Sequence, residues 1–181
     1  MKNASFVIRL RSLVIAAALV SQASAQTPAQ INQAEVLYRQ GVAAEEAGDP
    51  ATARQAYLEA LRANPRHANA QYSLGQLKIN YASITAKGRE AKFGDVMVPE
   101  FKLDDATLKE ALVALQMIIE KESKQQVMTN FILQDPKSAL AEAKITLVLK
   151  NTPARGVLQY LLAQANAKAR YDEHAIVIMP K

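Results

Sequence analysis

Residues 98–112 read VPEFKLDDATLKEAL and contain a change of hydrophobic periodicity. Phe101 and Leu103 alternate with charged neighbours, and alternation at every second position predicts a strand with one buried face. From Ala106 onward the apolar residues recur at helical spacing, which predicts an amphipathic helix that extends to about Lys121. This stretch therefore specifies a strand that leads directly into a helix.

Polar residues mark the junction between this strand and helix. Thr107 and Glu110 have the spacing of a capping box, in which each side chain bonds a free backbone N–H at the helix start. Asp104 and Asp105 precede them, and we expect this acidic pair to cap the same helix, since short carboxylates accept hydrogen bonds from such N–H groups. We interpret the pair as structural and not as a catalytic acid pair.

A second half of the same kind follows in residues 144–166. Alternating apolar residues predict a strand at 144–150, and Pro153 is typical of the first turn of a helix. A short strand is expected at 129–133, and a hairpin is expected around His174. The predicted domain, residues 97–181, is therefore α+β with the order strand, helix, strand, strand, helix, strand, strand. This order also fits a ferredoxin-like fold.

The segment upstream contains an internal repeat with an offset of 34 residues. Asp49 and Pro50 form a cap and a first helical position between two helical patterns, and the second of these patterns ends near Pro65. The positions that match at this offset are Ala34 with Ala68, Tyr38 with Tyr72, and Gly41 with Gly75. The offset predicts two helices followed by a copy of the first.

This segment resembles a tetratricopeptide repeat, a pair of antiparallel helices that stacks on its neighbours. The small, aromatic and proline positions of the family signature are occupied by Gly41, Ala53, Tyr57, Ala60 and Pro65. The resemblance covers residues 34–67 and continues through one further helix, so we assign residues 33–80 to tetratricopeptide-like helices. Lys87 stands where the family has a small packing residue, and residues 81–96 are predicted to be a helical extension and a linker.

In that family the inner face of the first helices binds extended peptides, and the resemblance implies such a face here. Its candidate residues are Glu35, Tyr38, Val42, Asn69, Tyr72 and Gln76. The alternative is that the two tyrosines only pack one helix against another. Because about three repeats are usually needed for stability, we expect these helices to pack on the C-terminal domain, on a second copy or on a partner.

Residues 97–181 resemble the short N-terminal domain of secretins and TonB-dependent receptors. The resemblance is carried by FKLDDATLKEAL at 101–112, KITLVLKNTP at 144–153, VLQYLL at 157–162 and AIVIM at 175–179. It implies two helices between two small sheets and a role in protein–protein docking in the periplasm. Family members place this domain ahead of a membrane channel or receptor barrel, whereas the sequence ends at Lys181. We therefore expect docking without the family's roles in secretion or iron uptake.

The first 25 residues have the layout of a secretory signal peptide, with a basic start, a short apolar core and small residues before Gln26. The apolar run is about half of the ~20 residues that span a bilayer, which disfavours a retained anchor. Cleavage between Ala25 and Gln26 predicts a periplasmic or secreted protein with a flexible leader at residues 26–32. Removing three basic residues leaves 22 − 3 = 19 basic against 17 acidic residues, a net charge of +2.

The composition disfavours most chemistry. The sequence has no cysteine, which excludes disulfides, thiolate metal sites and thiol catalysis, and its two histidines, His67 and His174, stand alone in turns. No glycine-rich phosphate loop is present, and the strand at 144–150 lacks the aromatic residues with which RNA-binding ferredoxin-like domains stack bases. We therefore expect no enzyme activity, no cofactor, no metal and no nucleic acid.

These patterns predict a non-enzymatic adaptor or scaffold of the bacterial cell envelope that binds another envelope protein or peptide segment, in association with a secretin-type or TonB-type assembly. The alternative from a structural class is a self-assembling envelope subunit in which a second copy of the chain is the partner. A nucleic-acid-binding ferredoxin-like domain is the third reading. The sequence does not identify the partner.

Overall fold

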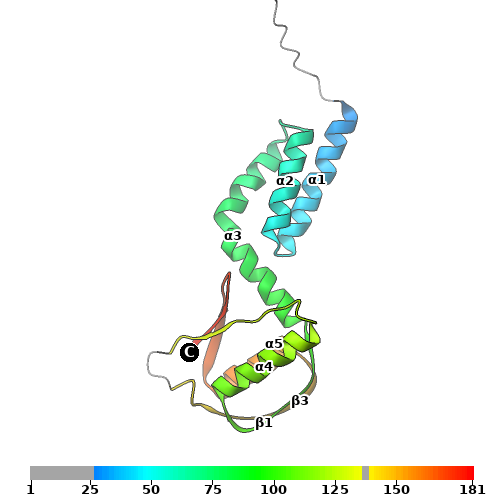
Figure 1. The fold of residues 1–181 in the computed structure, drawn as a ribbon. Helices are drawn as coiled ribbons and strands as arrows, with labels where there is room; N and C mark the ends of the chain where they lie inside the picture. The colour runs from blue at the N-terminus through cyan, green and yellow to red at the C-terminus, as the bar shows by residue number, and fades with distance from the viewer. Residues whose placement is uncertain (1–26, 136–138) are drawn as a thin grey trace, which may run out of the picture.

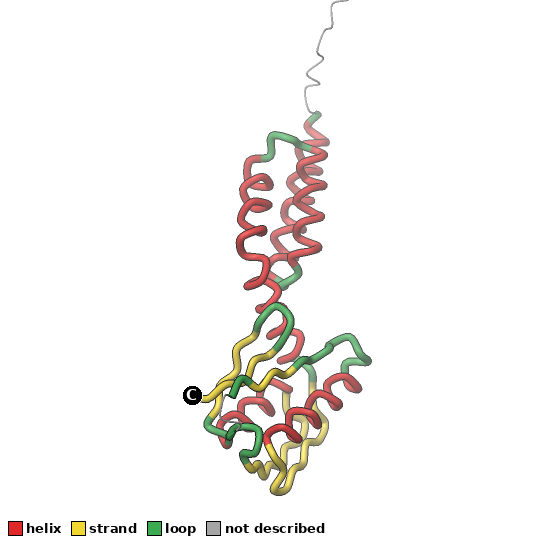
Figure 2. Tube along the Cα trace, turned by 60° about the vertical axis from the view of Figure 1, so that its left-hand side comes forward, coloured by secondary structure: helices red, strands yellow, loops and turns green. Residues whose placement is uncertain are grey.

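A computed structural model describes residues 27–135 and 139–181. The signal peptide expected at residues 1–25 lies outside the described residues. The described chain is mixed α+β, with three helices at the N-terminal end and a small domain of two helices and two small sheets at the C-terminal end (Figures 1 and 2). No helix among the described residues is long and apolar enough to cross a membrane.

The first two helices form an antiparallel hairpin. α1 spans Pro28–Glu46 and α2 spans Pro50–Ala63. The Thr27 side chain accepts a hydrogen bond from the backbone N–H of Gln30, and proline at the first helical position suits a helix start. Residues 28–32 were expected to be a flexible leader, and this cap instead makes them the first turns of α1.

The third helix joins the two parts of the molecule. α3 spans Ala68–Gly94 without a break and runs from the helical hairpin into the C-terminal domain (Figure 1). The linker expected within residues 81–96 is thus reduced to residues 95 and 96. Phe93, in the last turn of α3, is fully buried in the core of the C-terminal domain. One helix therefore contributes to both cores.

Glycines allow the helices of the N-terminal part to approach closely. A Cβ added at Gly41 would lie 2.4 Å from the Tyr57 ring, and one added at Gly88 would lie 2.3 Å from the carbonyl oxygen of Gly48. Gly48 has a φ of +75°, a conformation that side chains disfavour. Lys87 was expected to disrupt the repeat, but its neighbour Gly88 supplies the small residue at this contact.

The C-terminal domain contains a two-stranded sheet in which β1, Met97–Thr107, pairs antiparallel with β3, Lys144–Pro153. An irregularity between Leu103 and Ala106 interrupts the pairing, and Asp105 there has a φ of +52°. The expectation that Asp104 and Asp105 cap the next helix is wrong, because both residues belong to β1.

Its second sheet has three strands in the order β2-β5-β4. β2, Phe131–Leu133, is parallel to β5, Ile176–Pro180, while β4, Ala167–Tyr171, is antiparallel to β5. β4 and β5 form the hairpin that was expected around His174, with Tyr171 paired with Ile176. The order of elements along the chain follows the predicted order.

Both helices of this domain share its core with both sheets. α4 spans Leu108–Glu122 and begins with the expected capping box of Thr107 and Glu110, and α5 spans Ala154–Gln164. The fully buried residues of the core come from β1, α4, β3, α5, β4, β5 and the end of α3. Burial of so many apolar side chains gives this domain a core of its own.

Candidate functional site

The candidate residues of α1 lie at a hollow between α1 and α3. Tyr38 and Val42 line this hollow of about 380 Å³ together with Ser73 and Lys87 of α3. The Tyr38 ring packs 5.8 Å from the ring of Tyr57 and so is only partly available to a ligand. The proposed peptide-binding role and the alternative packing role of Tyr38 therefore share one side chain.

Glu35 takes part in a polar cluster that links α1 to the start of α3. Its carboxylate lies 2.9 Å from Nε of Arg39 and 3.3 Å from Nε2 of His67. The hydrogen bond from Arg39, supported by His67, lowers the pKa of the Glu35 carboxyl. The His67 ring lies 5.0 Å from the ring of Tyr38. Two candidate residues of the peptide face thus help to hold α3 against α1.

His67 has a structural position that the sequence did not reveal. Its Nδ1 accepts a hydrogen bond from the backbone N–H of Ala70, at 3.2 Å, so that His67 is the N-cap of α3. With Nδ1 as acceptor, the neutral ring carries its proton on Nε2 and donates it to Glu35. Only the repeat, which places His67 just before the copy of the first helix, hinted at this capping role.

The buried Tyr57 anchors the helical hairpin through its hydroxyl. This hydroxyl donates a hydrogen bond to the Glu45 carboxylate at 2.8 Å, while the ring lies against Gly41. Burial is the main cause that raises the pKa of Tyr57, and the neighbouring Glu45 carboxylate adds to it. The sequence identified Tyr57 as a packing residue, and the structure adds its polar partner.

The candidate residues of α3 do not join those of α1 at the hollow. Tyr72 is 70% exposed and Asn69 is also exposed, whereas Gln76 is half-buried, and none of the three lines the hollow that contains Tyr38. Tyr72 is seven residues before Ile79 and three before Gly75, so these three residues share one face of α3. Ile79 is 76% exposed. The six candidates therefore do not form one continuous surface.

The repeat identifies this outer face of α3 as the equivalent of a covered face of α1. At Gly41, the Tyr57 ring of α2 occupies the space beside the glycine. At the equivalent Gly75, apart from the backbone of α3 itself, no atom of the described residues lies within 4 Å of an added Cβ. The face of Tyr72, Gly75 and Ile79 thus lacks the helix that α2 provides for α1.

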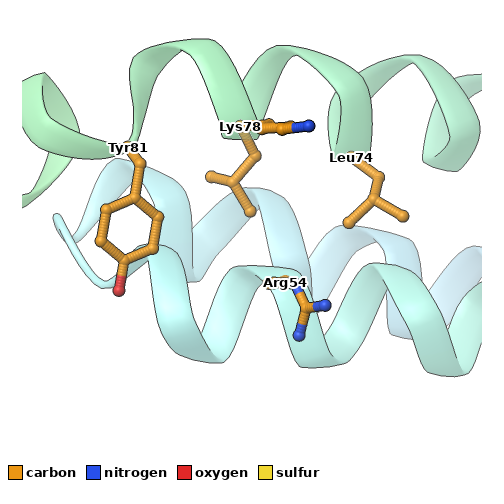
Figure 3. Close-up of a pocket in the computed structure, with 5 residues that line it drawn as sticks. Arg54, Leu74, Lys78 and Tyr81 are labelled. Carbon is orange, nitrogen blue, oxygen red and sulfur yellow. The ribbon is translucent and has the colours of Figure 1, made fainter.

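A second hollow lies between α2 and α3. Its volume is about 540 Å³, and Figure 3 shows Leu74 and Tyr81 projecting from α3 toward α2, where Arg54 is located. Leu77 and Lys78 complete its lining. Sequence reasoning missed this place, although Leu74, Leu77 and Tyr81 have the spacing of one helical face. We call these five residues the α2–α3 groove.

The described residues hold no group of three or more histidine, cysteine, aspartate or glutamate side chains that could bind a metal ion. His174 lies in the β4–β5 turn with an 84% exposed side chain, 3.7 Å from the Glu173 carboxylate. Asp105 lies 3.4 Å from the Lys144 ammonium group. These are surface ion-pair geometries, and the absence of enzyme activity stays a prediction.

Comparisons with protein-family models, with curated proteins and with solved structures find no match to this chain.

Proposed function

We propose that this chain is a non-enzymatic protein–protein interaction adaptor of the bacterial cell envelope. In this proposal its helices are tetratricopeptide-like, and its C-terminal domain is of the short N-terminal type found in secretins and TonB-dependent receptors, associated with an assembly of one of those types. The observation that carries the proposal is the outer face of α3, where Tyr72 and Ile79 are exposed beside the open Gly75.

The chemistry of this face supports binding of a protein helix. Its side chains between Tyr72 and Ala86 are apolar or small on the line that runs through Gly75, Ile79 and Ala82. Glycine allows close approach of a second backbone, and an exposed aromatic residue is a frequent anchor of protein interfaces. The packing of Tyr57 on Gly41 provides the pattern for such a contact within the same chain.

Continuity of α3 supports the adaptor role. The same helix carries the exposed Tyr72 near its start and the buried Phe93 near its end. Arg89 adds to this junction, since its Nη2 donates a hydrogen bond to the carbonyl oxygen of Glu173 at 2.8 Å. A partner bound at the outer face would therefore be held at a defined position relative to the C-terminal domain.

Site-specific photo-crosslinking in a bacterial host that exports the chain tests the proposal. A photoreactive phenylalanine analogue replaces Tyr72 or Ile79, and replacement of the exposed Arg62 of α2 is the matched control. We expect adducts with one envelope protein from the first two positions and none from the control. Equal adducts from all three positions, or none from any, would reject the proposal.

The same experiment separates an adaptor from a self-assembling subunit. An adduct of twice the mass of the chain from Tyr72 identifies a second copy as the occupant of this face. Mass spectrometry of the exported chain checks the proposed cleavage, with Gln26 expected as the first residue. A product that retains residues 1–25 would contradict the proposed processing.

A further inference from the structure

The α2–α3 groove carries charge of one sign. Arg54 lies on α2 and Lys78 on α3, and both side chains line the groove. Among the described residues, neither cation has a carboxylate oxygen within 4.0 Å. Two cations beside one apolar hollow favour a partner with negative charge.

The surrounding sequence reinforces this charge. Residues 60–89 include no aspartate and no glutamate. The basic residues within the same stretch are Arg62, Arg66, Lys78, Lys87 and Arg89. The end of α2 and most of α3 therefore offer no internal carboxylate to neutralise the groove, in contrast to the ion pair of Glu35 with Arg39 on α1.

The floor of the groove is apolar. Leu77 is 1% exposed, Leu74 is half-buried, and Tyr81 forms one wall with 38% of its surface exposed. A volume of about 540 Å³ is sufficient for one or two large side chains. An apolar floor between two cations fits an apolar side chain flanked by carboxylates.

We propose that the α2–α3 groove binds an acidic segment of a partner protein. An apolar side chain of that segment lies between Leu74 and Tyr81, and neighbouring carboxylates pair with Arg54 and Lys78. This inference rests on the proposed adaptor function and specifies the chemistry of a partner. It concerns a different face of α3 from that of Tyr72 and Ile79.

The apolar floor favours a protein segment over nucleic acid. Nucleic-acid binding is dominated by contacts to successive phosphates along a basic surface, whereas the two cations of the groove flank leucine side chains. Aromatic stacking with bases requires an accessible ring face, and Tyr81 is the single aromatic residue in the lining.

Fluorescence anisotropy with two labelled peptides tests the proposal on the full chain. The acidic probe is EELEELLEELEE, and the neutral probe QQLQQLLQQLQQ keeps the same leucine spacing. We expect the acidic peptide to bind about five-fold more tightly at low salt, because two exposed cation–carboxylate contacts are modest in strength. This preference should fall as salt rises.

Paired variants locate the binding. The double variant Arg54→Ala, Lys78→Ala is expected to abolish the preference for the acidic peptide. The matched control Arg62→Ala, Lys87→Ala removes two cations from the same two helices outside the groove and is expected to retain it. Tyr81→Ala is expected to weaken both peptides, since it removes one apolar wall.

Several results would overturn the proposal. Equal binding of the two peptides excludes charge recognition, and an equal loss in both double variants excludes the groove as the place of binding. Tighter binding of a thymidine dodecamer than of the acidic peptide favours nucleic acid. A dimer by light scattering that Arg54→Ala, Lys78→Ala dissociates makes a second copy the occupant.

Failure of this inference is distinguishable from failure of the proposed function. The crosslinks from Tyr72 and Ile79 report on the outer face of α3 and do not depend on Arg54 or Lys78. If those crosslinks form while both peptides bind equally, the adaptor function stands and the acidic partner of the groove is rejected.

Discussion

The helical part and the C-terminal domain differ in how completely they bury their apolar residues. The buried cluster of the helical part consists of Ala53, Tyr57, Leu77 and Ile84. The C-terminal core draws buried residues from two helices, two sheets and the end of α3. Repeat units bury their apolar faces on neighbours, and here the outer face of α3 has no neighbour among the described residues.

The difference shows how one helix can serve two purposes. The last turn of α3 is stabilised by the C-terminal core through Phe93, whose ring lies 6.0 Å from that of Phe131. The middle of α3 packs on the helical hairpin on one side only. A folded domain thus anchors a helix whose remaining face stays available for binding.

The largest expected effect comes from breaking the link between the two parts. Phe93→Ala should lower the free energy of unfolding by about 3–5 kcal/mol, because it leaves a cavity among buried aromatic and aliphatic side chains. Urea denaturation followed by circular dichroism measures the loss. The control Tyr72→Ala truncates an exposed aromatic residue of the same helix and should change stability by about 0.5 kcal/mol or less. Equal losses in both variants would show that Phe93 does not anchor α3.

Two glycines of α3 sharpen the contrast between its covered and open faces. Gly88→Ala should destabilise the protein by about 1–3 kcal/mol, because the new Cβ would meet the backbone of Gly48. Gly75→Ala should instead stabilise it by about 0.5–1 kcal/mol, since alanine favours the helix and the space beside Gly75 is open. Thermal unfolding of both variants provides the test. Destabilisation by Gly75→Ala would show that the outer face is covered.

Alkaline pH distinguishes the two parts through their tyrosines. The folded protein holds the Tyr57 proton more tightly than the unfolded chain, so stability should fall as pH rises above about 10, by at most about 1.4 kcal/mol per pH unit for this group. Burial also raises the pKa of Tyr171, to about 12, which adds a contribution of the same sign from the C-terminal domain.

Urea denaturation at pH 9 and pH 11 measures this dependence. Tyr57→Phe should flatten it because the hydroxyl that titrates in the unfolded chain is gone, although the variant also loses the hydrogen bond to Glu45 at every pH. An unchanged slope in Tyr57→Phe would contradict the assignment.

The smallest expected effect compares the same cap in the two parts. Thr107→Ala removes the capping box of α4, whose first turn is packed in the C-terminal core, and should cost about 1 kcal/mol. Thr27→Ala removes the capping box of α1, whose first turn is exposed, and should cost less than about 0.5 kcal/mol of global stability. Denaturation of the two variants side by side measures the difference, and equal costs would show that the start of α1 is as firmly packed as that of α4.

Much of the local structure could be predicted from periodicity and caps. The strand that contains Phe101, the helix that begins with the Thr107–Glu110 box, and the β4–β5 hairpin all occur where the sequence indicates them. The start of α1 was missed because Thr27 and Pro28 were not recognised as a cap and a first helical position. Asp104 and Asp105 were misassigned because acidic residues before a helix usually cap it, whereas here β1 extends to Thr107 itself.

The candidate site was less predictable than the fold. The offset of 34 residues correctly related Tyr38 to Tyr72 as positions in a repeat, but equivalent positions have different surroundings when only one of them is followed by a packing helix. Tyr38 is covered by Tyr57 and His67, while Tyr72 is exposed. The α2–α3 groove escaped notice because Arg54 comes from another helix than the rest of its lining.

The sequence by itself determined the order of elements, the helix ends marked by capping boxes, and the apolar face of each helix and strand. These properties depend on residues close together in the chain. Only the tertiary structure decided which apolar faces are covered, since Phe93 is buried by residues far along the chain and the face of Tyr72, Gly75 and Ile79 is covered by none of those described. Hydrophobic periodicity defines a face that can be buried, and contacts between distant segments determine whether it is.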